Sequence, residues 1–226
     1  MSEEILNALI QLLAIIAKQD EGVHHKELDF VESFLTQQLG HEAVQNYLTE
    51  FKKKAEIDEF VPVEKKKKKL TPVQESVRTL ALCRKINKTL DQNQKIVVLV
   101  RLFEMVNTSG QFTEQRMAII DTVAEVFNIS KEEYGNIRDF VIEKEMNKLD
   151  KSTILIIDDE DIVCQHCLSI KTEKIDGIIL ILRIASSELY FLRYTGSESL
   201  LLNGLPVTNN RIYLLSLIHI SEPTRP

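Results

Sequence analysis

Three carboxylates near one predicted turn are the residues of this sequence best suited to chemistry. Asp20 and Glu21 precede Gly22, and Glu27 follows one helical turn beyond it. Carboxylates that converge at a helix–turn–helix junction can bind a hard cation such as Ca²⁺ or Mg²⁺, which prefers oxygen ligands. The loop is not an EF-hand, because Leu28 stands where that loop needs a glutamate. We predict a metal site at Asp20, Glu21 and Glu27; the alternative is that these acids are solvated and complement a helix dipole.

Histidines and cysteines offer two further possibilities. His24 and His25 neighbour the acidic turn, but adjacent histidines at a helix start diverge and no HExxH pattern is present, so we predict a capping role. Cys164 and Cys167 form a CxxC pair, and Cys83 is the third cysteine. Zinc needs four ligands, so a zinc or redox β module is the weaker interpretation and an exposed loop with two incidental thiols the stronger one.

No motif of catalysis occurs in the chain. It has no nucleophile elbow, no GxxxxGK[ST] phosphate loop and no GxGxxG run. We therefore expect a chain that is not an enzyme, with no catalytic residue and no bound cofactor other than a possible divalent cation.

Composition limits the partners and the compartment. The 226 residues are 44% hydrophobic and 27% charged, an ordinary globular balance. The net charge of −6 argues against nucleic acid as a partner. The N-terminus is acidic where a signal peptide is basic, no apolar run reaches the roughly 18 residues of a membrane span, and three cysteines make no disulfide framework. We expect a cytoplasmic protein.

Helices position the acidic turn. Apolar residues recur at helical spacing, and Thr71-Pro72, Asp91, Thr113 and Ser130 supply helix starts. The predicted helices span about 3–19, 25–39, 41–55, 72–90, 92–107, 114–127 and 131–146. Between the third and fourth, residues 57–70 lack periodicity and contain five consecutive lysines at 65–69, which predicts a solvated linker.

An internal repeat relates two parts of this helical region. At an offset of 89 residues, Leu13 falls on Leu102, and both copies read as helix, short polar turn, cap, helix. Two such αα hairpins can bury their apolar faces in one bundle. The metal-site acids are not repeated, because Ser109-Gly110 and Arg116 stand at the corresponding positions.

β-prone runs follow residue 150. They lie at 153–157, 177–184, 188–194, 199–202 and 211–214, with an Asn203-Gly204 hairpin signal. The predicted fold class is therefore α+β in two domains: an all-α helical bundle of two repeated αα hairpins at 1–149, then a small, truncated all-β unit at 150–214. Residues 215–226 look like a translated sequencing adapter, and we expect the natural protein to continue beyond Leu214.

The run from Ala17 to Leu28 resembles the hallmark of TerB-like (tellurite-resistance) domains. It combines an alanine at a helix end, an acidic turn with a glycine, and a Glu-Leu pair seven residues after Asp20. Glu21 stands where that family usually has glycine. The resemblance implies a helical domain associated with metal or stress responses and with scaffolding at membranes.

The order of parts is also similar to the N-terminal region of Bacteroidota ABC transporter ATP-binding proteins. The stretches that carry this resemblance are 76–80, 112–119 and 190–197, and 202–207 is similar to a hairpin of forkhead-associated domains. The Arg and Ser-x-x-His residues with which forkhead-associated domains bind phosphothreonine have no counterpart.

This resemblance implies a non-catalytic regulatory or interaction region. It would bind a protein partner or its own downstream nucleotide-binding domain, with ATP, Mg²⁺ and any membrane contact confined to a missing C-terminal part. The alternative is a stand-alone cytoplasmic stress-response protein that binds a divalent metal.

Overall fold

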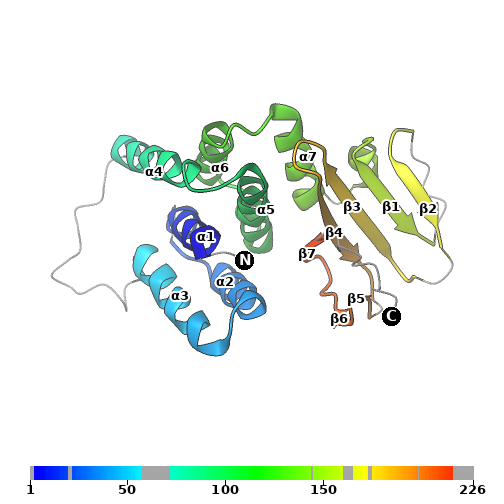
Figure 1. The fold of residues 1–226 in the computed structure, drawn as a ribbon, viewed down its shortest axis with the longest axis horizontal. Coiled ribbons are helices and arrows are strands. Elements are labelled where there is room, and N and C mark those ends of the chain that lie inside the picture. The colour runs from blue at the N-terminus through cyan, green and yellow to red at the C-terminus, as the bar shows by residue number, and fades with distance from the viewer. Residues whose placement is uncertain are drawn as a thin grey trace, which may run out of the picture. The chain divides into compact units, whose positions relative to one another are not determined.

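The chain folds into two compact units, which span residues 1–142 and 143–226 (Figure 1). The computed structural model describes residues 3–19, 22–57, 72–143, 145–159, 165–172, 175–197 and 199–215. Asp20, Glu21, Cys164, the five lysines of the predicted linker and the proposed adapter from Ser216 onward lie outside the described residues. The predicted boundary after Leu149 falls later than this division, because the short 3-10 helix η3 (Met146–Leu149) belongs to the second unit.

Seven helices make up the described part of the first unit, as predicted. They are α1 (Glu3–Ala17), α2 (His25–Gln38), α3 (His41–Lys54), α4 (Pro72–Asn87), α5 (Gln92–Ser109), α6 (Glu114–Val126) and α7 (Lys131–Ile142).

Local capping explains where several of these helices begin and end. The Asp91 side chain accepts a hydrogen bond from the backbone N–H of Gln94 at 2.8 Å, and the Gln94 side chain accepts one from the backbone N–H of Asp91 at 2.9 Å, which is a capping box. The Ser130 hydroxyl caps α7 by accepting from the N–H of Glu133 at 3.1 Å. Gly110 ends α5 with φ +72°, a left-handed conformation that glycine adopts without steric cost.

The core of the helical unit is centred on α1 and α5. Every residue from Ile96 to Val106 on α5 is buried, and α1 buries its apolar residues almost all round. α5 packs against α1, α2, α6 and α7, which explains why its sequence is apolar on more than one face. α1 contacts α3 as α5 contacts α7, so the offset of 89 residues relates three helices in each copy rather than the two predicted. None of the helices in the described part of the chain has the length and apolar character needed to cross a membrane.

A five-stranded sheet forms most of the second unit. Its order is β2 (Leu168–Lys171), β1 (Ile154–Asp158), β3 (Ile178–Ile184), β4 (Leu189–Thr195) and β7 (Ile212–Leu215). β5 (Leu201–Leu202) and β6 (Leu205–Pro206) form the hairpin predicted at Asn203-Gly204. Leu215, assigned from the sequence to the tail, is the last residue of β7 and pairs with Tyr190.

The sheet is mixed, and one of its strands was not predicted. β1 pairs with β2 in parallel, with Leu155 opposite Leu168 and Ile157 opposite Ile170, whereas the other pairings are antiparallel. β2 was missed because all four of its residues are exposed, so burial imposes no alternation of apolar and polar residues on its sequence.

A small apolar core lies on one face of the sheet. Ile179, Leu192 and Tyr194 are buried there with Val207, which follows the β5–β6 hairpin. The Tyr194 hydroxyl donates a hydrogen bond to the carbonyl oxygen of Asp176 at 2.7 Å and so ties the turn before β3 to β4. The hairpin therefore covers one part of this face.

Candidate functional site

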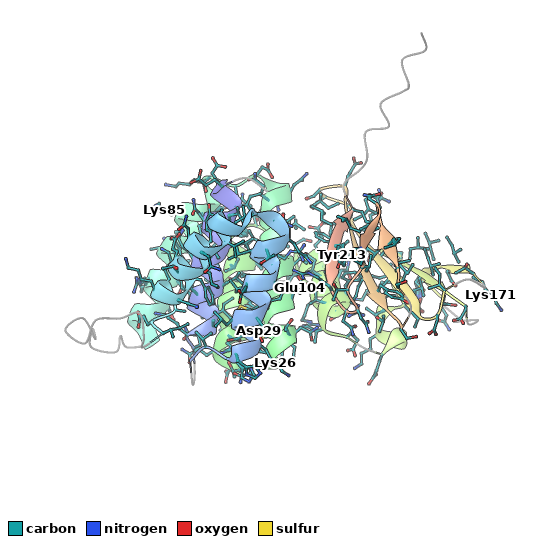
Figure 2. The ribbon with its side chains drawn as sticks, turned by 90° about the horizontal axis from the view of Figure 1, so that it is seen from below. Lys26, Asp29, Lys85, Glu104, Lys171 and Tyr213 are labelled. Atoms are coloured by element: carbon teal, nitrogen blue, oxygen red, sulfur yellow. The ribbon has the colours of Figure 1, made fainter. Side chains whose placement is uncertain are left out.

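Glu27 and Arg116 occupy equivalent positions of the two repeats, 89 residues apart, and they contact each other. Each lies three residues after a helix N-cap, Glu27 on α2 after His24 and Arg116 on α6 after Thr113. The neighbours of Glu27 along α2, Lys26 and Asp29, are exposed and lie at one end of the helical unit (Figure 2). Glu27 thus belongs to the inward face of this first turn.

Local hydrogen bonds set the two helix starts. At α2 the His24 Nδ1 accepts from the N–H of Lys26 at 3.3 Å, and Glu27 Oε2 accepts from the N–H of His24 at 3.0 Å. This confirms the capping role predicted for His24. At α6 the Thr113 hydroxyl accepts from the N–H of Arg116 at 3.3 Å. These capping hydrogen bonds fix the helix starts from which the Glu27 and Arg116 side chains extend.

The Arg116 guanidinium and the Glu27 carboxylate form an ion pair in which neither side chain is exposed to solvent, with 0% accessibility for both. Arg116 Nη1 donates to Glu27 Oε1, while Nη2 donates to the carbonyl oxygens of Ala17 at 3.3 Å and Gly22 at 3.4 Å. These carbonyls belong to the end of α1 and to the turn before α2. One guanidinium from the second repeat therefore contacts the end of α1, Gly22 and the first turn of α2 in the first repeat.

Two glutamines extend this junction. The Gln115 amide donates to Gln19 Oε1 at 2.6 Å, and Gln19, which is buried, donates to the carbonyl oxygen of Ile15 at 2.7 Å. Gln19 is the last described residue before the turn. The first helix is in this way connected to α6 by a second polar contact.

A second buried ion pair lies within α5. Arg101 Nη1 contacts Glu104 Oε2 at 2.5 Å, and the Arg101 guanidinium lies 5.5 Å from the centroid of the Phe34 ring on α2. Glu104, labelled in Figure 2, is buried. Because buried charges need partners to offset their lost hydration, each pair compensates charges that folding has removed from water.

Of the three predicted metal ligands, the structure describes only Glu27. Both of its carboxylate oxygens accept hydrogen bonds, one from Arg116 and the other from the backbone of His24. Over the described ranges, no group of three or more His, Cys, Asp or Glu side chains is placed to hold a metal ion. A carboxylate with no solvent exposure that already pairs with arginine does not fit a divalent cation; the assignments of Asp20 and Glu21 remain predictions.

Two of the three cysteines, Cys83 and Cys167, are among the described residues. Cys83 on α4 is buried and free, and burial raises the pKa of its thiol to about 11. Cys167 is disulfide-bonded, which differs from the incidental free thiol expected from the sequence. Its backbone N–H donates to Asp150 at 2.8 Å, as does that of His166 at 2.7 Å. These hydrogen bonds lower the pKa of the Asp150 carboxyl to about 2.

Arg116 is the site residue that the sequence prediction did not recognise. Its place opposite Glu27 in the repeat was evident, but it was interpreted only as the loss of an acid. The sequence feature that could have indicated this contact is the opposite charge at two positions related by the repeat.

Comparison with known families identifies the helical unit. The family described as "Tellurite resistance protein TerB" matches residues 6–139. The chain belongs to the TerB family. No curated protein and no solved structure matches the chain. The TerB match extends from α1 into α7, and the mixed β-sheet unit follows it. TerB is not a known catalytic family, and the expectation that the chain is not an enzyme stays a prediction.

Proposed function

We propose that this TerB-family chain is a non-catalytic regulatory and interaction region of an ABC-type transporter ATP-binding protein, acting at the cytoplasmic face of the membrane. Its partner would be the nucleotide-binding domain of the same protein, which would supply ATP and Mg²⁺ chemistry. The observation that favours an interaction role over the metal-binding alternative is that Glu27, the one described member of the predicted metal site, is used for an internal ion pair.

The helical unit supports a binding role through its rigidity. The ion pair Glu27–Arg116 lies in its interior and connects α2 with α6. The pair Arg101–Glu104 is also buried, and its arginine lies over the ring of Phe34 on α2. A body held in this way keeps its surface geometry when a partner binds, which lowers the conformational cost of association.

The β unit supports the same role through its edge strand. β2 is the first strand in the sheet order, and Leu168 and Ile170 are 65% and 51% exposed on it. An edge strand carries backbone groups that can pair with a strand of another domain, and apolar side chains would add buried area to such pairing. We propose this edge as the contact for the nucleotide-binding domain.

The gene sequence downstream of codon 214 tests the assignment most directly. We expect an open reading frame that encodes a GxxxxGK[ST] loop, because that loop binds the nucleotide phosphates. A stop codon immediately after codon 214 in the untrimmed sequence would reject the transporter assignment.

A binding experiment tests the proposed edge. The nucleotide-binding domain, once cloned, is titrated into isotope-labelled residues 1–215, and resonances of β2 should shift. Leu168→Lys with Ile170→Lys should weaken binding at least tenfold, and Val77→Lys, at an exposed apolar position of α4, is the matched control. Shifts confined to helices, with affinity unchanged by the β2 substitutions, would contradict the proposed edge.

The family match favours one alternative, a stand-alone cytoplasmic stress-response protein that binds a divalent cation through Asp20, Glu21 and Glu27. In that protein Glu27 would have to exchange Arg116 for the metal. Calorimetric titration of the chain with Ca²⁺, Mg²⁺ and Zn²⁺ separates the alternatives. Heat of binding that disappears in Asp20→Asn would favour the metal protein.

A further inference from the structure

The guanidinium of Arg116 lies among oxygen atoms that come from the other repeat. Glu27 contributes a carboxylate oxygen, and Ala17 and Gly22 contribute backbone carbonyl oxygens. Carboxylate and carbonyl oxygens are ligands for cations, and here the cation is the guanidinium group of Arg116. All three oxygens lie on the segment from the end of α1 to the first turn of α2.

We propose that the oxygen atoms of Ala17, Gly22 and Glu27 form a cation site that the chain fills with its own Arg116. The ligand of the site is a guanidinium cation. Substitution of Arg116 by a small residue should leave a site that accepts a guanidinium compound from solution. This inference uses the same ion pair as the proposed function, but its test does not require a nucleotide-binding domain, so either can fail without the other.

Burial makes a cation necessary at this position. Glu27 has no exposed surface, so without Arg116 its carboxylate would be a buried and uncompensated charge. Breaking a buried ion pair at one partner is strongly destabilising for that reason. The same electrostatic cost favours binding of any cation that fits the space left by the arginine side chain.

The arrangement of these oxygen atoms favours a guanidinium group over a divalent ion. Nη1 faces the carboxylate, and Nη2 is shared between two carbonyls at 3.3 and 3.4 Å, which uses the planar fork of the guanidinium group. A calcium ion takes six to eight oxygen ligands at about 2.3–2.6 Å, and magnesium requires near-octahedral geometry. Glu27 cannot serve either ion while its oxygens are bonded to Arg116 and to the His24 backbone.

Chemical rescue of Arg116→Ala tests the proposal. N-ethylguanidinium restores the atoms that this substitution removes beyond Cβ, and the neutral N-ethylurea has a similar shape without the charge. Thermal unfolding is followed by circular dichroism with each compound at low millimolar concentration. At 100 times its dissociation constant, N-ethylguanidinium should shift the unfolding equilibrium of Arg116→Ala about a hundredfold towards the folded state, as expected from mass action.

Three controls separate the site from general effects. The wild-type chain and Arg138→Ala, which removes an arginine with a half-exposed side chain on α7, should not be stabilised by N-ethylguanidinium. Glu27→Gln combined with Arg116→Ala should lose the preference for N-ethylguanidinium over N-ethylurea, because the buried negative charge is gone. If Arg116→Ala does not fold, the readout is the recovery of helical signal on addition of N-ethylguanidinium.

Any of three results would overturn the proposal. The first is equal stabilisation of Arg116→Ala by N-ethylurea, and the second is no stabilisation by either compound. The third is calorimetric binding of Ca²⁺ or Mg²⁺ to the wild-type chain that is abolished in Glu27→Gln, since this would mean that a metal displaces Arg116 from Glu27.

Discussion

Arg116 occupies a position that local rules disfavour. It lies in the first turn of α6, where the helix dipole and the unpaired backbone N–H groups favour an acid over a base. Glu27 fills the same position of α2 and completes a capping box there. The unfavourable local placement of Arg116 is offset by a partner 89 residues away and by two carbonyl groups. Its residue type follows from tertiary contact rather than from helix formation.

Cys83 should be unreactive in the folded chain. Burial raises the pKa of its thiol to about 11, so very little thiolate, the nucleophilic form, exists near pH 8. In a background with Cys164→Ser and Cys167→Ser, alkylation by iodoacetamide should be at least tenfold slower without urea than in unfolding urea, as measured by mass spectrometry of the Cys83 peptide. Equal rates in the two conditions would show that α4 opens readily.

Asp150 should make the stability of the β unit depend on pH in the acidic range. The backbone N–H groups of His166 and Cys167 hold the pKa of its carboxyl at about 2 in the folded chain, against about 4 in an unfolded chain. The stabilisation is therefore complete above pH 4 and is lost as the pH falls through 2. The difference in urea midpoint between wild type and Asp150→Asn should be constant from pH 6 to 4 and shrink below that. A difference in urea midpoint that persists undiminished at pH 2 would contradict the lowered pKa of Asp150.

At the scale of elements, close backbone approach constrains the start of the β3–β4 ladder. A Cβ on Gly196 would collide with the carbonyl oxygen of Asp176 and with the Tyr194 hydroxyl, the two groups that hydrogen-bond to each other. Gly177, at the other side of this contact, has φ +117° and faces the backbone of Thr195. The glycines at 177 and 196 therefore allow the turn before β3 to lie directly on the end of β4.

Gly196→Ala should destabilise the chain by about 1–3 kcal/mol, the range for overpacking a tight site. Gly135→Ala is the matched control, because no atom lies within 4 Å of the added Cβ and the residue is inside α7. That control should stabilise by up to about 1 kcal/mol through helix propensity. Thermal unfolding of the two variants should thus shift in opposite directions, and a shift of the same sign would contradict the packing argument.

At the scale of the whole molecule, the two repeats share a plan but not every contact. α1 packs on α3 as α5 packs on α7, and Glu27 meets its own counterpart Arg116. α2 packs against α5, whereas α6 packs mainly against α4, a helix without a counterpart in the first repeat. The two repeats therefore share the packing of their first and third helices but differ in what their second helix packs against.

Exchanging the two charges tests this local equivalence. Glu27→Arg and Arg116→Glu each place like charges in a buried contact, and each should destabilise by about 3–5 kcal/mol or more, as when a buried pair is broken. The double variant restores an opposite pair, and Glu at 116 gains the capping-box position after Thr113. It should recover only part of the summed loss in urea denaturation, because a glutamate at position 116 cannot donate to the carbonyl oxygens of Ala17 and Gly22. Strictly additive losses would show that the two sides of the junction are not equivalent.

The sequence by itself determined the features that depend on neighbouring residues. Apolar spacing and cap residues such as Asp91, Thr113 and Ser130 predicted the helices, because their hydrogen bonds reach only two or three residues along the chain. The Asn203-Gly204 turn predicted the β5–β6 hairpin for the same reason. The spacing around Gly22 likewise indicated the TerB family, which the match over residues 6–139 confirms.

Only the tertiary structure decided which distant residues meet. The parallel pairing of β2 with β1 and the contact between Glu27 and Arg116 depend on how the elements pack, and no local pattern specifies such pairings. Glu27 was predicted as a metal ligand because a carboxylate beside an acidic turn has the right chemistry. Packing instead placed an arginine against it in a site closed to water, where the guanidinium offsets the charge that a cation would otherwise have to balance.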